Sequence, residues 1–331
     1  MRLVTYNIEW FAHLFDDADN LMLDDQSSGR YGVDRYTQGR AIAHVLQRLD
    51  ADAVMVVEAP NTGRKQRCTR ALERFAAEAG LRTDTAVSGF ATDTHQEIAL
   101  LYDPAVLDVE ADPQASKRAP RFDDSFLIDL DVDDRMDRVR FSKPPLELQV
   151  RTKGGVALRL IGAHLKSKAP HGAETAEEVA RISIANRRKQ LAQAIWLHRR
   201  IKEHVEAGEN VIVMGDLNDG PGLDEYERLF GKSSVEIVMG AELTDPHAQS
   251  LLKPREPVLP STSRFYNPET KRYFRALLDY IMISHGLEAY GPHWRIWHPF
   301  EDAECYDDIP LREALLAASD HFPVSLDLEL T

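Results

Sequence analysis

The sequence of 331 residues predicts an α+β protein in which helices cover an inner layer of β-sheet. Short apolar runs of strand length recur along the whole chain. Amphipathic helical patterns lie between some of these runs but not between all of them, which disfavours a strictly alternating parallel α/β fold. We therefore expect a sandwich with sheets inside and helices outside.

The strand-like runs are mostly continuous and apolar, as in strands that are covered on both faces. None approaches the roughly 20 apolar residues that a membrane span needs. The predicted strands are residues 3–6, 53–57, 98–102, 146–150, 156–163, 211–214, 277–283 and 324–330.

Three segments carry apolar residues at helical spacing. Two of them are residues 37–49 and 69–79, and Gly80 after the second is a typical helix stop. The longest predicted helix runs from about residue 177 to 207, and Gly208 suits its end. Its expected buried stripe comprises Leu191, Ala194, Ile195, Ile201 and Val205.

Two stretches without such patterns are expected to form long loops. Residues 13–34 are rich in Asp, Gly and Ser, and residues 112–143 hold a dense cluster of acids. We interpret both mainly as solvated surface. Loops of this length can also shape a substrate cleft.

Composition limits the classes of function. Lys and Arg total 40 against 54 for Asp and Glu, a net charge of −14, which argues against a protein that coats nucleic acid through a basic face. A phosphate substrate held through metal ions remains compatible, because carboxylates bind hard cations. Cys68 and Cys305 form neither a disulfide framework nor a zinc-ligand set. With no secretory signal pattern at the start, we expect the cytoplasm.

Polar residues recur where the apolar runs end. A turn or a helix cap explains any one of them alone. Asp279 is different, because it lies within an apolar run and a buried carboxylate is costly unless it is paired or binds a cation. Converging carboxylates repel one another unless Mg²⁺ or Mn²⁺ neutralises them. The set comprises Asn7, Glu9, Glu58, His164, Asp216, Asn218, Asp279, Asp320 and His321.

This set resembles the endonuclease/exonuclease/phosphatase superfamily, which has the deoxyribonuclease-like fold, and its bacterial nuclease-like members above all. The resemblance implies a four-layer α/β/β/α sandwich with two packed mixed β-sheets. It also implies one domain over residues 1–331, with loop insertions near 13–34 and 112–143. The pieces that carry it run in the family's order: Thr5-Tyr6-Asn7-Ile8-Glu9-Trp10, Val57-Glu58-Ala59-Pro60-Asn61, Gly162-Ala163-His164-Leu165-Lys166, Gly215-Asp216-Leu217-Asn218, Leu278-Asp279-Tyr280 and Ser319-Asp320-His321.

The resemblance also implies a metal site for Mg²⁺, with Mn²⁺ as the alternative. Glu58 matches the family's metal-ligand glutamate. Asp320 matches the aspartate that reaches the metal region, and Glu9 matches an acid that helps to hold the metal or its waters.

Catalytic roles carry over in the same way. Asp216 matches the aspartate that orients or deprotonates the attacking water. Asn7 and Asn218 match amides that hold this aspartate and the phosphate oxygens, and His321 with Asp279 matches the His–Asp pair at the scissile phosphate.

His164 matches a histidine that the deoxyribonuclease and sphingomyelinase branches place against the phosphate or the leaving oxygen. Abasic-site endonucleases carry tyrosine there, which disfavours that activity. Lys166 and Lys168 resemble a run of the bacterial branch and either hold substrate phosphate or lie in a solvated loop. Asn61 recurs in that branch too, and it either contacts substrate or caps a turn.

One local charge feature opposes the overall acidity. Residues 181–202 contain seven Lys and Arg residues and no acid. Such a stripe can track a phosphate backbone. We favour the outer face of an amphipathic helix instead, because no interleaved aromatics accompany it.

The leading hypothesis is a divalent-metal-dependent hydrolase of phosphate esters, a nuclease-like phosphodiesterase that uses in-line attack by water. An alternative is a phosphatase or phosphodiesterase of a small-molecule or lipid-head-group phosphate, which the net charge of −14 favours. An alternative of another class is a catalytically inactive binding protein on the same fold. The expected partner is a phosphate-ester substrate, with nucleic acid as one candidate.

Overall fold

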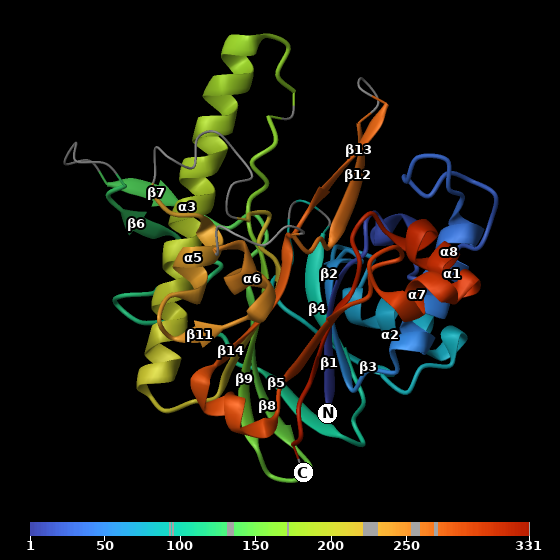
Figure 1. Cartoon of the computed structure of the whole chain (residues 1–331), viewed down its shortest axis with the longest axis horizontal. Helices are drawn as coiled ribbons and strands as arrows, with labels where there is room; N and C mark the ends of the chain where they lie inside the picture. The colour runs from blue at the N-terminus through green and yellow to red at the C-terminus, as the bar shows by residue number, and fades with distance from the viewer. Residues whose placement is uncertain are drawn as a thin grey trace.

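Two six-stranded sheets packed face to face form the centre of the molecule, and helices cover their outer faces (Figure 1). The structure is a computed structural model that describes residues 1–92, 94, 96–130, 136–170, 172–220, 231–252, 259–267 and 271–330. The expected α/β/β/α sandwich with two mixed sheets is confirmed.

The first sheet has the order β15-β16-β1-β2-β4-β3. Its β1 and β2 are parallel, with Asn7 opposite Val57, and the other neighbours are antiparallel. The strands are β1 (Arg2–Asn7), β2 (Ala53–Ala59), β3 (Thr85–Ser88), β4 (Glu97–Tyr102), β15 (His293–Ile296) and β16 (Val324–Asp327).

The second sheet has the order β11-β14-β10-β9-β8-β5. Its β9 and β10 are parallel, so that Asp216 lies opposite His164 on one side and opposite Asp279 of antiparallel β14 on the other. The strands are β5 (Leu107–Ala111), β8 (Leu146–Thr152), β9 (Ala157–His164), β10 (Val211–Asp216), β11 (Leu243–Thr244) and β14 (Asp279–Ser284).

The core between the sheets is apolar and closely packed. Leu3 and Met55 of the first sheet pack with Leu160 and Ile212 of the second. Gly162 permits this close approach, because a Cβ atom there would lie 2.4 Å from the Met55 sulfur. The sandwich thus holds the strand ends of both sheets at one edge.

Helices form the two outer layers. One layer comprises α1 (Arg35–Leu49), α2 (Cys68–Ala79), α7 (Ala303–Asp307) and α8 (Ile309–Ala318), with the 3-10 turn η1 (Phe11–Leu14). The other comprises α3 (Ala176–Glu206), α5 (Ser234–Met239) and α6 (Pro246–Leu251). A second 3-10 turn, η2 (His285–Tyr290), follows β14.

The predicted elements are found within a few residues of their expected bounds, but two expectations are wrong. Residues 112–143 are not only loop, because they include the antiparallel pair β6 (Phe126–Ile128) and β7 (Asp137–Val139). Residues 131–135 of this stretch lie outside the described residues. The basic stripe of 181–202 is not wholly on the outer face of α3 either. Arg187 and Arg200 are buried, where they pair with Asp219 and Glu147.

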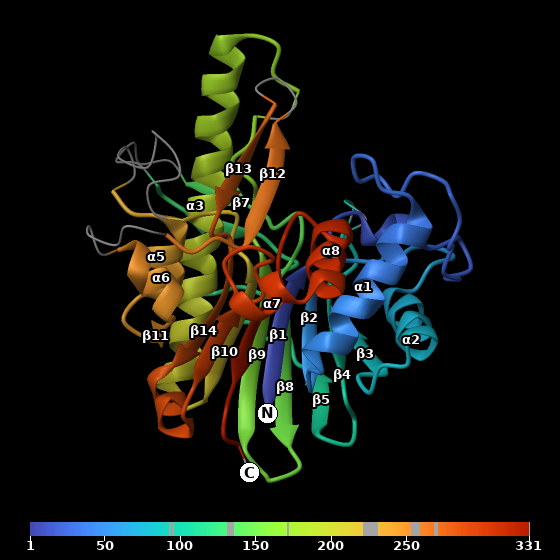
Figure 2. The same ribbon diagram turned by 45° about the vertical axis from the view of Figure 1, so that its right-hand side comes forward.

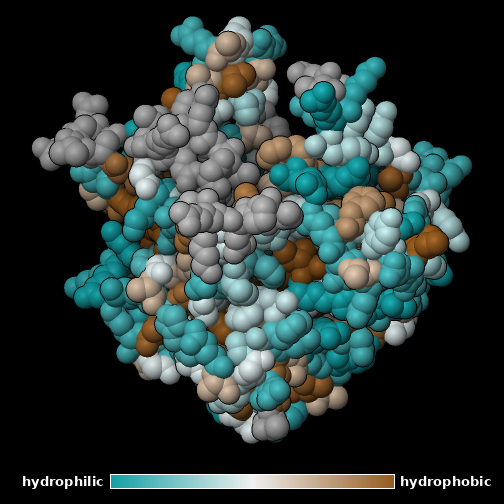
Figure 3. Space-filling model, in the orientation of Figure 1, coloured by the Kyte–Doolittle hydropathy of each residue, from teal (hydrophilic) through white to brown (hydrophobic). Residues whose placement is uncertain are grey.

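Two features project beyond the same edge of the sandwich in both ribbon views (Figures 1 and 2). They are the N-terminal part of α3 and the antiparallel pair β12 (Ser263–Asn267) and β13 (Arg272–Ala276). The face shown in Figure 3 is mostly hydrophilic, with hydrophobic residues scattered among polar ones. Among the described residues, no helix has the length and apolar character needed to cross a membrane.

Candidate functional site

The polar residues at the strand ends surround one cavity of about 680 Å³. It opens at the edge where β1, β2, β9 and β10 end. The predicted site residues that line it are Asn7, Glu9, Glu58, His164, Lys168, Asp216, Asn218, Asp320 and His321. Asp279 lies directly behind His321.

Asp216 is buried at the end of β10 and is held by two asparagines. The Asn7 side-chain amide donates to its Oδ2 at 3.0 Å, and the Asn218 backbone N–H donates to its Oδ1 at 2.7 Å. Gly215 just before it has φ 141°, and a Cβ atom there would lie 2.0 Å from the Ala163 carbonyl oxygen. Burial raises the pKa of Asp216 to about 7, with Asp279 adding to the rise and His321 opposing it. This carboxyl group therefore titrates near neutrality.

His321 and Asp279 form a buried pair. The His321 Nδ1 lies 2.7 Å from the Asp279 Oδ2, and the Thr262 hydroxyl donates to the same oxygen at 2.8 Å. Burial alone would lower the pKa of His321, but the Asp279, Asp216 and Asp320 carboxylates outweigh it and raise the pKa well above its usual value. The imidazole is therefore held as a cation, with its Nε2 4.0 Å from the Asp216 Oδ2.

His164, unlike His321, is uncharged. Burial, followed by the nearby Lys143 and His321, lowers its pKa well below the usual value and keeps the ring neutral. Its Nε2 lies 3.2 Å from the Lys143 Nζ and 3.6 Å from the Asp216 Oδ2. The cavity thus contains one neutral and one cationic imidazole, both within 4.0 Å of the same Asp216 oxygen.

The Glu58 side chain is directed into the cavity by an irregular backbone. A β-bulge interrupts the pairing of β2 with β4 between Val57 and Ala59, and Glu58 has φ 61°. Left-handed backbone is unusual for glutamate and is typical of functional sites. The Gln96 side-chain amide donates to the Glu58 Oε2 at 2.7 Å. Burial raises the pKa of Glu58, and the Glu9 carboxylate raises it further.

Glu9 and Asp320 complete a group of carboxylates. Arg30, from the predicted 13–34 loop, pairs with Glu9. Burial raises the pKa of Asp320 to about 7, with Glu9 and Glu58 adding to the rise. Among the described residues, neither Glu58 nor Asp320 has an ion-pair partner.

The donor chemistry of this group fits a divalent cation. Glu58 and Asp320 offer hard oxygen ligands whose mutual repulsion a cation would relieve. Asp216, Asp279 and His321 also bring one ligand atom each within 4.8 Å of one another. There, however, the imidazole cation already offsets part of the negative charge of the two acids. The fit is therefore better at Glu58 and Asp320, with Glu9 beside them.

Buried polar atoms without partners mark the same cavity. Within the described part of the chain, the Asn7 Oδ1, the His164 Nδ1 and the Asp279 Oδ1 have no hydrogen-bond partner. Buried polar atoms in folded proteins are nearly always satisfied, so unsatisfied ones indicate a place for a ligand, an ion or ordered water.

The three predicted substrate-binding residues lie in different places. Lys168 lines the cavity and pairs with Asp219 at 2.5 Å. The Lys166 ammonium donates to the Ser167 carbonyl. Asn61 instead lines a neighbouring cavity of about 430 Å³ that shares Glu58 with the first, and its amide donates to the Gln66 side chain.

Several residues of the cavity were not predicted from the sequence. Lys143 lies in the predicted 112–143 loop, and no motif marks it. Gln96 precedes a predicted strand, where a polar residue is a weak signal of function. Phe265 of β12 lies with its ring edge toward His321, 5.4 Å between ring centroids, and belongs to a strand that the sequence did not predict.

Comparisons with known proteins follow this geometry. The model of the Endonuclease/Exonuclease/phosphatase family matches residues 4–321. No curated protein matches the sequence. Similar solved structures include an endonuclease/exonuclease/phosphatase family protein of Bacteroides thetaiotaomicron, with 15% identity, 98% of this chain and 96% of that chain covered, and a TM-score of 0.53.

A mannosyl-6-phosphatase of the same organism is also similar, with 15% identity, 99% of both chains covered and a TM-score of 0.51. So is D. rerio TDP2 complexed with a single-strand DNA product, with 14% identity, 98% of this chain and 97% of that chain covered and a TM-score of 0.50. At these identities the likeness concerns the fold.

Proposed function

Because this chain belongs to the endonuclease/exonuclease/phosphatase family, we propose that it is a divalent-metal-dependent phosphodiesterase. The observation that carries the proposal is the arrangement around Asp216. Two amides hold this carboxyl group, one neutral and one cationic imidazole lie close to it, and two acids without ion-pair partners lie in the same cavity.

Asp216 is proposed to aim the attacking water. Its pKa of about 7 lets the carboxylate accept a proton at neutral pH, and the amides of Asn7 and Asn218 fix its orientation. In-line attack on a phosphate ester depends mainly on such positioning and on stabilisation of charge.

The two histidines are proposed to act on the phosphate group. The His321 imidazolium supplies a positive charge and an N–H donor that Asp279 holds in place. Neutral His164, with Lys143 beside it, offers a ring nitrogen to a phosphate or leaving-group oxygen. A divalent cation held by Glu58 and Asp320, with Glu9 beside them, would offset phosphate charge and stabilise the leaving oxygen.

A diester is proposed as the substrate, with a nucleic-acid strand as the preferred class. A structure of similar fold was determined with a single-strand DNA product, and a local group of Lys and Arg residues adjoins the cavity. The second candidate is a small phosphate monoester or a lipid head group. The net charge of −14 favours it, and another protein of similar fold is a sugar phosphatase.

The test compares hydrolysis of bis(para-nitrophenyl) phosphate with that of para-nitrophenyl phosphate, each with Mg²⁺, with Mn²⁺ and with EDTA. Asp320→Ala is the loss-of-function control. Arg151→Gln is the matched control, because Arg151 is exposed at the opposite end of the second sheet from His164.

Diester turnover that needs the metal and Asp320 would support the proposal. Turnover of the monoester alone would favour the phosphatase. Turnover that neither EDTA nor Asp320→Ala reduces would contradict the proposed site. If neither ester is hydrolysed, calorimetric metal binding separates a substrate-selective enzyme from an inactive binding protein.

A further inference from the structure

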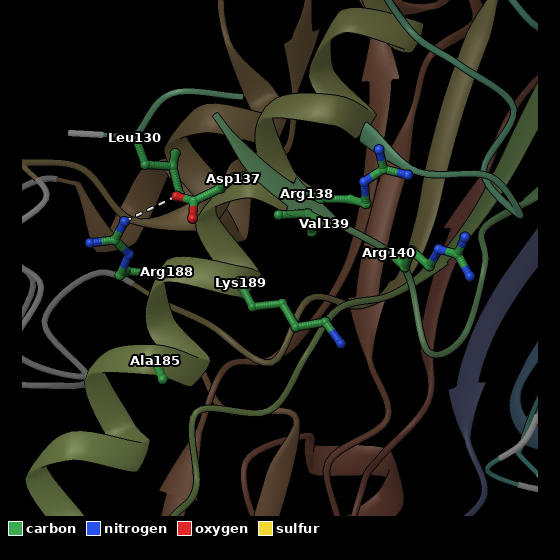
Figure 4. A pocket seen from close by; sticks show the side chains of 8 residues that line it. All are labelled: Leu130, Asp137, Arg138, Val139, Arg140, Ala185, Arg188 and Lys189. Carbon is green, nitrogen blue, oxygen red and sulfur yellow. Dashed lines mark hydrogen bonds and ion pairs between the residues drawn. The ribbon is translucent and has the colours of Figure 1, made fainter. Parts of the chain in front are cut away.

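A further pocket, also of about 430 Å³ but distinct from the one lined by Asn61, lies between β7 and α3 (Figure 4). Its lining is markedly basic, with one acid among the charged groups. The residues are Leu130, Asp137, Arg138, Val139, Arg140, Ala185, Arg188 and Lys189.

Three of its cations extend to one side of the pocket in Figure 4. They are Arg138, Arg140 and Lys189, whereas Arg188 extends to the other side and pairs with Asp137 at 3.0 Å. Arg138 and Arg140 are exposed, and neither guanidinium has a hydrogen-bond or ion-pair partner among the described residues. These two groups are therefore available to an external anion.

Two sets of contacts connect this pocket with the catalytic cavity. The Gln193 amide donates to the Arg140 carbonyl at 3.3 Å, and the Gln193 carbonyl oxygen accepts from the Lys166 backbone N–H at 2.9 Å. Lys189 lies one turn earlier on α3, and its ammonium donates to the Ser142 hydroxyl at 3.2 Å. The next residue, Lys143, contacts His164 inside the cavity.

The cations therefore form a row from the cavity to the pocket. Burial lowers the pKa of Lys166, and the Lys189 ammonium lowers it further. Burial likewise lowers the pKa of Lys143, the Glu58 and Asp216 carboxylates oppose this, and Lys166 adds to the lowering. Neighbouring ammonium groups that repel one another in this way are stabilised when an anion binds between them.

We propose that this row, from Lys143 through Lys166 and Lys189 to Arg138 and Arg140, binds the phosphates of a nucleic-acid strand next to the scissile one. The inference rests on the proposed function and names the substrate class and the direction in which the strand leaves the cavity. The row is also a local basic surface on an otherwise acidic molecule, and it would attract the strand electrostatically.

A row of five cations fits a strand, which carries several phosphates, better than a small phosphate ester. Arg140 and Lys143 are three positions apart in the chain, so their Cα atoms lie at most about 11 Å from each other. At a rise of about 3.4 Å per nucleotide, this upper limit corresponds to at most about three nucleotides. A small ester would occupy only the end of the row at His164.

The test is binding of a fluorescent single-stranded oligonucleotide in EDTA, so that no cleavage occurs, between about 50 and 200 mM salt. Wild type is compared with the double variant Arg138→Gln/Arg140→Gln and with Arg151→Gln. Each phosphate contact to a single strand adds about 0.7 to the slope of log affinity against log salt. The double variant should therefore lower the slope by about 1.4 and weaken binding at low salt, whereas Arg151→Gln should leave both unchanged.

A peptide nucleic acid of the same sequence, which has no phosphates, should not bind. Equal slopes for wild type and the double variant would overturn the proposed role of this row, as would the absence of binding to wild type. Because the binding assay needs no turnover, these results are separate from the diester assay that tests the proposed function. Both arginines are exposed, and circular dichroism checks that the double variant is folded.

Discussion

At the residue scale, the molecule gives similar side chains different chemistry through their surroundings. His164 and His321 both lie near the Asp216 carboxyl group, yet one is neutral and the other is a cation. Lys143 beside His164 and Asp279 beside His321 account for the difference. This contrast is what assigns the two rings to different roles.

Asp216→Asn and His321→Ala should each lower turnover of the diester at least about a hundredfold, because one removes the base and the other a positioned charge. Steady-state kinetics measures the loss, and thermal unfolding checks that the variants are folded. Turnover close to that of wild type in either variant would refute its assigned role.

Glu58→Gln should weaken activation by Mg²⁺ at least about tenfold, because an amide is a poorer ligand for a hard cation than a carboxylate. Isothermal calorimetry gives the affinity without turnover. Glu110→Gln is the matched control, since Glu110 is exposed on β5 of the second sheet. Equal affinities in wild type and Glu58→Gln would show that the metal binds elsewhere.

At the element scale, strand ends and helix starts are connected by buried polar groups. Asp245 caps the start of α6, where its Oδ1 accepts from the backbone N–H groups of His247 and Ala248. Its other oxygen accepts from the Ile281 N–H in β14. One carboxyl group thus joins a helix to the sheet that carries Asp279.

Burial raises the pKa of Asp245 to about 6. Because the folded pKa exceeds the unfolded one, the folded state binds more protons, and this contribution to stability is lost as the pH rises through about 6. From about pH 5 to pH 7, the free energy of unfolding of wild type should fall by about 1 kcal/mol relative to Asp245→Asn. Urea unfolding at both pH values measures it. If the difference in free energy of unfolding between wild type and Asp245→Asn does not vary with pH, the pKa of Asp245 is not raised.

Gly215 sets how closely β10 approaches β9 just before Asp216. Gly215→Ala should lower the free energy of unfolding by about 3 kcal/mol or more, because its Cβ would clash with the Ala163 carbonyl oxygen at a positive φ. Gly208→Ala is the control, since Gly208 also has a positive φ but has nothing within 4 Å. It should cost only about 1 kcal/mol. If urea unfolding gives equal losses of free energy of unfolding for Gly215→Ala and Gly208→Ala, the close approach of β10 to β9 has no special role.

At the scale of the whole molecule, the sequence was informative wherever buried apolar runs dictate structure. Parallel pairing of β1 with β2 and of β9 with β10 brings their polar ends to one edge, so residues such as Asn7 and Asp216 could be grouped in advance.

The parts that could not be predicted depend on tertiary contacts. Strands β7 and β12 are short and partly exposed, so they lack a periodic apolar pattern. The pairing of Arg30 with Glu9 exists only because a loop packs back onto α8, where Arg30 also donates to the Leu316 carbonyl. Nothing local in either segment indicates that contact.

Water aimed by Asp216 is proposed to attack phosphorus in a metal-dependent hydrolysis. The most direct measurement is hydrolysis of bis(para-nitrophenyl) phosphate with Mg²⁺ in water enriched in heavy oxygen, with mass analysis of the products. We expect one labelled oxygen in the nitrophenyl phosphate and none in the nitrophenol, with the reaction abolished by EDTA and by Asp216→Asn. Unlabelled phosphate, or labelling at an unchanged rate in Asp216→Asn, would contradict this mechanism.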